Sequence, residues 1–118
     1  MKKILCIDDD RSILELRRHV LESSGYDVLL APSGQDGLRL ASRGEIDLVI
    51  LDYMMPGMDG AEVAESLKSV FPKLPVIAMS SVQVPVRMAA TVDACIPKGQ
   101  RVEVLLSAVS SALAARPS

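Results

Sequence analysis

Acidic side chains directly follow two short apolar runs of this chain. Asp8, Asp9 and Asp10 end the first run, and Asp52 ends the second. If Asp8, Asp9 and Asp52 meet in the fold, their like charges repel, and ionising all three is costly without a cation. Carboxylate oxygens suit a hard divalent ion, and Mg²⁺ in proteins typically takes one or two carboxylates, several waters and a phosphate oxygen. A fold that joins the two acidic clusters would therefore contain a magnesium site.

The runs before these carboxylates are Ile4–Ile7 and Leu48–Leu51, both short and rich in aliphatic side chains. Such runs are typical of strands buried on both faces. Open α/β sheets bind ligands in the crevice beyond the carboxyl ends of their strands. The alternatives are plainer: Asp52 as a strand-end residue that caps a turn, and the Asp8–Asp10 cluster as a solvated helix start. Asp10 is expected to have such a capping or electrostatic role.

Apolar periodicity divides the rest of the chain into alternating strands and helices. Further strands are expected at Asp27–Ala31, Val76–Met79 and Ala94–Ile96, with helices between the strands. Right-handed crossovers then give a parallel sheet with helices on both faces. The expected fold is a doubly wound, five-stranded α/β sheet in a single domain, residues 1–118, with no output domain.

The helices carry apolar stripes that predict which faces are buried. Ser12-Ile13-Leu14-Glu15 fits a capping box at the start of the first helix, and Ile13, Leu16 and Val20 recur at helical spacing. In two later helices the expected inner faces are Val63, Leu67 and Val70, and Val102, Leu105, Leu106, Val109 and Leu113.

The segment Asp52-Tyr53-Met54-Met55-Pro56-Gly57-Met58-Asp59-Gly60 resembles the phosphoacceptor segment of response-regulator receiver domains, the chemotaxis-regulator-like modules of two-component signalling. Asp8-Asp9, Ser80 and Lys98 are similar to that family's other site positions. The resemblance covers nearly the whole chain. It implies a flavodoxin-like strand order of 2-1-3-4-5. From the residues alone, Pro56-Gly57 predicts a tight turn.

The resemblance also implies how Mg²⁺ would be held. Asp9 and Asp52 are implied as direct ligands, Asp8 as a ligand through water, and the backbone carbonyl of Met54 as a further ligand. Carboxylates elsewhere act as nucleophiles that form an aspartyl phosphate. Asp52 is implied to be the phosphoacceptor.

Lys98 and Ser80 are implied to contact the transferred phosphoryl group. Charge on that group lies on its equatorial oxygens, so cations and donors assist the transfer. Lys98 would supply a cation beside Mg²⁺, and the hydroxyl of Ser80 would donate to a phosphoryl oxygen. Taken singly, Lys98 is better explained as a surface lysine after a turn, and Ser80 as a turn residue at a strand end; the functional interpretation depends on the other matches.

Several features depart from the family's pattern. Gly99 follows Lys98 where the family usually has Pro, so the customary cis bond is not expected. Cys95 stands where the family usually has a Tyr or Phe that moves inward on activation. Ser80 and Lys98 are closer in sequence than is usual by roughly one helical turn. Pro85 interrupts the stretch 83–91, which predicts a shortened or irregular fourth helix. These departures leave the acceptor site intact and concern the face that reports phosphorylation.

Composition narrows the classes of partner. The net charge of -2 gives no case for direct nucleic-acid binding, which would need a basic face. No apolar run approaches membrane length, so a cytoplasmic protein without membrane insertion is expected. Cys6 and Cys95 have no motif spacing and are expected to be buried free thiols.

The resemblance implies a phosphoacceptor module that is not an enzyme beyond its own Mg²⁺-dependent phosphorylation and dephosphorylation. A phosphohistidine on a sensor histidine kinase or on a histidine phosphotransfer protein would be the donor. Phosphorylation would shift the face formed by strand 4, helix 4, strand 5 and helix 5 and so reach a downstream effector protein. Three alternatives remain: a phosphorylation-independent docking module, an aspartyl-phosphate phosphatase and a flavin-binding domain. The phosphatase usually needs a second carboxylate where Met54 stands.

Overall fold

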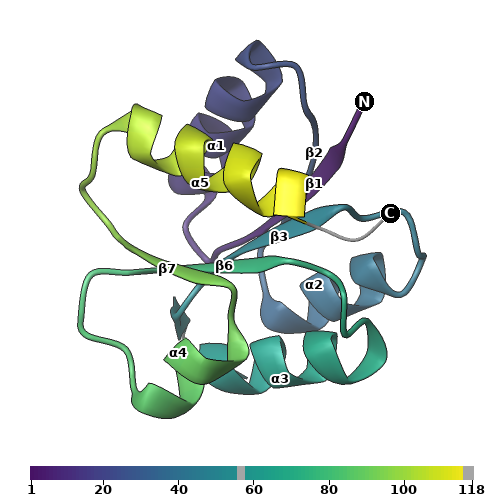
Figure 1. Cartoon of the computed structure of the whole chain (residues 1–118), viewed down its shortest axis with the longest axis vertical. Coiled ribbons are helices and arrows are strands. Elements are labelled where there is room, and N and C mark those ends of the chain that lie inside the picture. The colour runs from purple at the N-terminus through teal and green to yellow at the C-terminus, as the bar shows by residue number, and fades with distance from the viewer. Residues whose placement is uncertain (56–57, 116–118) are drawn as a thin grey trace.

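The computed structural model describes residues 1–55 and 58–115 of the chain (Figure 1). Five strands form one parallel sheet in the order β2-β1-β3-β6-β7, which confirms the expected doubly wound topology. A two-stranded antiparallel pair, β4 and β5, follows β3, so the predicted fourth and fifth strands are β6 and β7. The strands are β1 Lys3–Ile7, β2 Asp27–Ala31, β3 Leu48–Asp52, β4 Met54–Met55, β5 Met58–Asp59, β6 Val76–Ser80 and β7 Ala94–Pro97.

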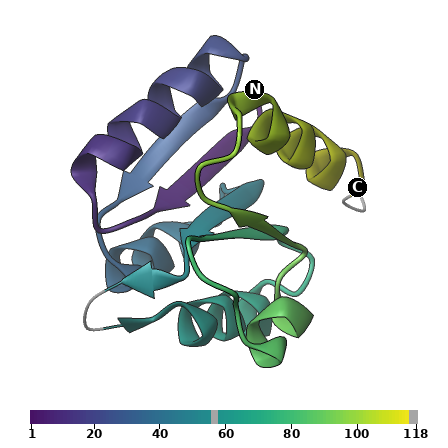
Figure 2. The ribbon, with the colours of Figure 1, turned by 90° about the vertical axis from the view of Figure 1, so that its left-hand side faces the viewer.

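Helices cover both faces of the sheet, as Figures 1 and 2 show. One layer contains α1 and α5, and the other contains α2, α3 and α4. Within the described residues, no helix has the length and apolar character needed to span a membrane. The helices are α1 Arg11–Ser23, α2 Gly34–Ala41, α3 Gly60–Val70, α4 Val86–Thr91 and α5 Val102–Ala115.

Alternation along the buried strands separates the core into two halves. On β1, Ile4 and Cys6 pack in the half that α1 and α5 cover, whereas Leu5 and Ile7 pack in the half of α2, α3 and α4. The same alternation runs along β3. Because side chains on one face recur every second residue, Asp8 continues the row of Ile4 and Cys6. Asp52, the last residue of β3, continues the row of Leu48 and Ile50 in the same way, so Asp8 and Asp52 are directed toward the layer of α1 and α5.

Asp10 caps the first helix, and the capping box predicted at Ser12 is wrong. The carboxylate of Asp10 accepts hydrogen bonds from the backbone N–H of Ser12 at 2.9 Å and of Ile13 at 3.4 Å, and from the Ser12 hydroxyl at 2.6 Å. These bonds hold the pKa of Asp10 below its usual value, with the Ser12 hydroxyl as the largest cause. The expected capping role of Asp10 is confirmed.

The predicted inner face of α1 is also wrong. Leu16 has 62% of its surface exposed, whereas Leu14, Arg17 and Leu21 are the buried residues of this helix. Two stripes offset by one residue, one led by Ile13 and the other by Leu14, fit the same helix, and apolar periodicity alone favoured the one without a charge. Arg17 is buried because it meets a carboxylate at the end of the sheet, a partner that periodicity cannot reveal.

The later helices follow the prediction in part. Val63 and Leu67 are buried on α3 and Leu105 on α5, but Val70 is 67% and Val102 is 47% exposed. Val70 is the last residue of α3 and Val102 the first of α5, so the buried stripe is confined to the interior of each helix.

The fourth helix is short, as predicted, with only six residues. Pro85 does not interrupt it; it stands immediately before the first helical residue, and its carbonyl accepts the backbone N–H of Ala89 at 3.0 Å. A proline at a helix start costs no internal hydrogen bond. The side chain of Met88 anchors this helix in the core.

Candidate functional site

The sheet brings the two acidic clusters together. Ile7 of β1 pairs with Leu51 of β3 in parallel register. The next residue on each strand, Asp8 and Asp52, therefore lies beside the other at the carboxyl edge of the sheet. One carboxylate oxygen each from Asp8, Asp9 and Asp52 lie within 4.8 Å of one another. Asp8 and Asp52 are buried, and Asp9 is exposed. Carboxylate oxygens at this spacing fit the ligands of a divalent ion such as Mg²⁺.

Lys98 lies beside both buried carboxylates. Its Nζ is 3.0 Å from Oδ1 of Asp52 and 3.9 Å from Oδ2 of Asp8, and its side chain is 25% exposed. It therefore partly neutralises the acidic cluster and faces the edge that a substrate would approach. The contact with a phosphoryl group that the resemblance implies for Lys98 stays a prediction.

Backbone pairing fixes Lys98 at this edge despite its short distance from Ser80 in sequence. Ser80 of β6 pairs with Pro97 of β7, and the backbone N–H of Lys98 donates to the carbonyl of Ser80 at 2.8 Å. Gly99 then takes a φ of +87°, a backbone conformation that residues other than glycine rarely adopt. The shortened connection is absorbed in the six-residue α4, and the Lys98 side chain still reaches Asp52.

Ser80 lies at the edge but its hydroxyl is turned to its own loop. Oγ donates to the carbonyl of Val82 at 2.7 Å and accepts the backbone N–H of Val82 at 3.0 Å. Ser80 is buried, and by alternation it belongs to the half of the core that α3 and α4 cover. A contact between Ser80 and a group on Asp52 would require the hydroxyl to leave Val82.

The segment after Asp52 begins with Met54, whose backbone N–H donates to Oδ1 of Asp52 at 3.3 Å. The side chain of Met54 is 55% exposed. Its carbonyl as a metal ligand stays a prediction. The turn expected at Pro56-Gly57 lies outside the described residues. Beyond it, the close approach of α3 to the Asp52 loop requires glycine, because a Cβ on Gly60 would lie 2.6 Å from the carbonyl oxygen of Tyr53.

Arg17 belongs to the site, and sequence reasoning missed it. Nη1 donates to Oδ2 of Asp8 at 3.2 Å, and both side chains are more than nine-tenths buried. The backbone N–H of Asp10 donates to the other oxygen, Oδ1, at 2.9 Å. An arginine three residues after Leu14 and four before Leu21 was the available signal, since that spacing is itself a helical stripe.

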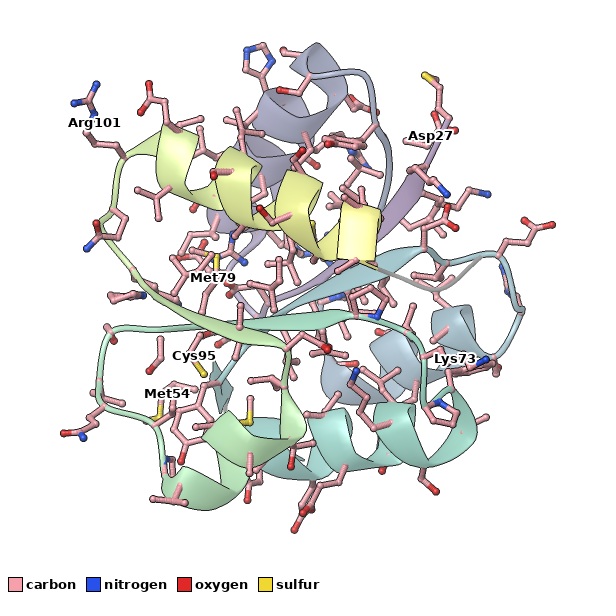
Figure 3. All side chains as sticks on the ribbon, viewed as in Figure 1. Asp27, Met54, Lys73, Met79, Cys95 and Arg101 are labelled. Carbon is pink, nitrogen blue, oxygen red and sulfur yellow. The ribbon has the colours of Figure 1, made fainter. Side chains whose placement is uncertain are left out.

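Cys95 departs from the expectation of two buried thiols. Cys6 is buried in β1, but Cys95 is exposed on β7. Figure 3 shows Cys95 on the side of the sheet that faces α4, whereas Met79 lies on the side of α1 and α5. A hollow of about 390 Å³, lined by Ser80–Val84 and Cys95–Lys98, lies beside it. The small side chain of Cys95 leaves this space open next to Ser80.

Comparisons with known proteins agree with this geometry. Residues 4–110 match the family model of the response regulator receiver domain. Among curated relatives, the response regulator MprA of Mycobacterium leprae is 35% identical over 94% of this chain and 50% of its own length. The alkaline phosphatase synthesis transcriptional regulatory protein PhoP of Bacillus subtilis is 40% identical over 68% of this chain and 33% of its own length. The chain thus spans half or less of these relatives.

Solved structures share the whole fold. A receiver domain protein from Clostridium thermocellum aligns with a TM-score of 0.90 at 29% identity, over 97% of this chain and 95% of that one. The response regulator TrrA from Thermotoga maritima, solved in complex with Mg²⁺ and beryllofluoride, aligns with a TM-score of 0.90 at 30% identity, over 95% and 99% of the two chains. The family match, the strand order and the acidic edge together show that this chain belongs to the response regulator receiver domains, the phosphoacceptor modules of two-component signalling.

Proposed function

We propose that Asp52 accepts a phosphoryl group from a phosphohistidine, with Mg²⁺ held by Asp9 and Asp52 and, through water, by Asp8. The observation that carries this proposal is the 3.0 Å contact between Lys98 and a buried Asp52, beside two further carboxylates. A docking module without phosphorylation would have no need for this charged and buried arrangement, so that alternative is not favoured.

The chemistry needs a nucleophile, a leaving group and cations. A carboxylate oxygen of Asp52 forms a bond to phosphorus as the bond from phosphorus to the donor's imidazole nitrogen breaks, and the imidazole leaves with the electron pair. When bound, Mg²⁺ neutralises charge on the phosphoryl oxygens. Lys98 is within reach to exchange its contact with Asp52 for one with a phosphoryl oxygen. Phosphorylation thus replaces the ion pair that holds the resting site.

The same exchange reaches the reporting face through Ser80. Its hydroxyl would leave the backbone of Val82 for a phosphoryl oxygen, so two hydrogen bonds that hold the following loop are lost. The hollow beside Cys95 gives the loop room to move. We therefore propose that phosphorylation is reported by reordering of the segment 81–91. This mechanism needs no aromatic side chain at position 95, where Cys95 stands. A ligand shifts such an equilibrium only through differential contacts, and Ser80 supplies them.

Response regulators act with sensor kinases and downstream effectors. For this chain we propose a sensor histidine kinase or a histidine phosphotransfer protein as donor, and an effector protein that binds the face formed by β6, α4, β7 and α5. Catalysis would be limited to its own phosphorylation and dephosphorylation, and the expected setting is the cytoplasm.

Phosphorylation of Asp52 is tested by intact-mass analysis after incubation with acetyl phosphate and MgCl₂. The wild type should gain one phosphoryl group and lose it again with time. Asp52→Ala should gain none, whereas Asp27→Ala, at the opposite end of the sheet, should behave as wild type. Equal labelling of Asp52→Ala would remove the assignment.

The metal site is tested by thermal unfolding in rising MgCl₂. An ion that binds only the folded state adds about 2.7 kcal/mol at a hundred times its Kd, so Tm should rise by several degrees. The rise should vanish in Asp9→Asn/Asp52→Asn and persist in Asp27→Asn. An equal rise in the double variant would place the ion elsewhere.

A further inference from the structure

We propose that Arg17 is a built-in cation that holds Asp8 and weakens the binding of Mg²⁺ at the acidic edge. This inference rests on the proposed metal site and adds to it a residue that tunes metal affinity. Arg17 touches Asp8 and no reacting atom, so it acts as a positioning residue.

The contacts of Asp8 leave its carboxylate little free capacity. Oδ1 accepts the backbone N–H of Asp10, and Oδ2 faces both Arg17 at 3.2 Å and Lys98 at 3.9 Å. A carboxylate can accept from several donors, but each charged donor reduces its attraction for another cation. Asp8 is therefore satisfied by protein groups before any metal arrives.

The net charge of the site shows how strongly Arg17 reduces its attraction for a divalent ion. Three carboxylates, Asp8, Asp9 and Asp52, contribute three negative charges, and Arg17 and Lys98 contribute two positive ones, which leaves one net negative charge. Without Arg17 the site would carry two, which matches the charge of a divalent ion. Burial makes the difference count, because the side chains of Arg17 and Asp8 are 7% and 1% exposed and solvent screens them little.

The positions of Arg17 and Lys98 indicate how the two positive side chains would respond to a phosphoryl group on Asp52. Arg17 sits on α1, between the buried Leu14 and Leu21, while Lys98 sits on the loop after β7. Lys98 is shared between Asp8 and Asp52, but Arg17 contacts Asp8 alone among the charged groups of the site. When Lys98 turns to a phosphoryl oxygen, Arg17 remains to neutralise Asp8.

The experiment titrates MgCl₂ against the unphosphorylated protein, with Kd read from amide chemical shifts. Arg17→Met should bind Mg²⁺ about tenfold more tightly than wild type or better, because one nearby positive charge is removed. Arg17→Lys, which keeps the charge, should stay close to wild type. Arg18→Met is the matched control: it removes a charge from the next position of α1, where Arg18 pairs with Glu15 at the surface, and should leave the Kd unchanged.

Removal of Arg17 takes away the ion-pair partner of the buried Asp8 carboxylate, so the Met variant is expected to be less stable without the metal. If Arg17→Met does not fold, Arg17→Gln takes its place, since it keeps an N–H donor for Asp8 without the charge. Unchanged or weaker binding in the Met or Gln variant, with binding retained by wild type, would overturn the role of Arg17 and leave the metal site standing. Loss of Mg²⁺ binding in every protein, wild type included, would overturn both.

Discussion

The two halves of the sheet's carboxyl edge differ in how firmly their side chains are held. At the ends of β1 and β3, Asp8 and Asp52 are buried and paired with Arg17 and Lys98. At the ends of β6 and β7, the loop from Ser80 leads into a six-residue helix, with a hollow beside an exposed Cys95. The acceptor half is preorganised, whereas the reporting half is loosely packed. Chemistry at one half can therefore reorganise the other at small cost.

The two cysteines give the largest expected contrast between these halves. Burial raises the pKa of the Cys6 thiol from 9.0 to about 12, and desolvation also raises that of Cys95, which is nevertheless exposed. Because a thiol reagent can reach Cys6 only after the protein unfolds, Cys95 should react at least about a thousandfold faster. Cys6→Ala and Cys95→Ala, each with one thiol, separate the two rates. Similar rates in the folded protein would contradict the firm packing around β1.

Loss of Lys98 should be the most damaging change to the chemistry after loss of Asp52 itself. Lys98→Met removes a cation 3.0 Å from Asp52, the proposed nucleophile, and removal of one such preorganised group typically slows a reaction about a hundredfold. The rate of phosphorylation by acetyl phosphate, followed by intact mass, is the measurement. Lys73→Met, a surface lysine at the opposite end of the sheet (Figure 3), is the matched control. A rate within twofold of wild type would exclude Lys98 from the phosphoryl site.

The reporting half should change its dynamics when the acceptor half is occupied. Beryllofluoride with Mg²⁺, an analogue of the phosphorylated state, should alter amide hydrogen exchange in the segment 81–91 by about tenfold, because Ser80 leaves Val82.

Ser80→Ala should abolish this change, while Ser81→Ala, at the exposed neighbouring position, should preserve it. Protection confined to the loops of Asp52 and Lys98 would disprove the coupling and revive the docking-module alternative.

The smallest effect concerns the cap of α1, which directs Arg17 into the site. The pKa of Asp10 is lower in the folded protein than its ordinary value of 3.8. The ionised cap therefore stabilises the fold fully above that value, and the contribution is lost as the pH falls through the folded pKa. The Tm of wild type relative to Asp10→Asn should be constant from pH 7 to about pH 5 and fall only below pH 4. A difference that widens in favour of wild type at low pH would contradict the cap.

Local sequence patterns predicted the strands and the acidic edge well. The apolar runs at Ile4–Ile7 and Leu48–Leu51 have no polar residue to place at a surface, so only a sheet covered on both faces can bury them. A strand that ends in carboxylates must then present them at the edge. The strand order needed the family resemblance, because parallel pairing is not encoded in a local pattern.

The helix faces and the partners of the charged residues were less predictable. On α1, the stripes led by Ile13 and by Leu14 satisfy the same period, and the fold buries the second because it places Arg17 against Asp8. Ser80 resembled a phosphoryl ligand, yet its hydroxyl is bound to Val82 in the resting protein. Each of these outcomes depends on a contact between groups far from the local pattern or on a loop whose course the pattern leaves open.

By itself the sequence determined where the chain is apolar, where it turns, and which acidic residues end its buried strands, because these follow from the preferences of neighbouring residues. Only the tertiary structure decided that Lys98 meets Asp52 and that Arg17 neutralises Asp8. A buried charge is stable only beside an opposite one, and which opposite charge it meets depends on how helices and strands distant in sequence pack together.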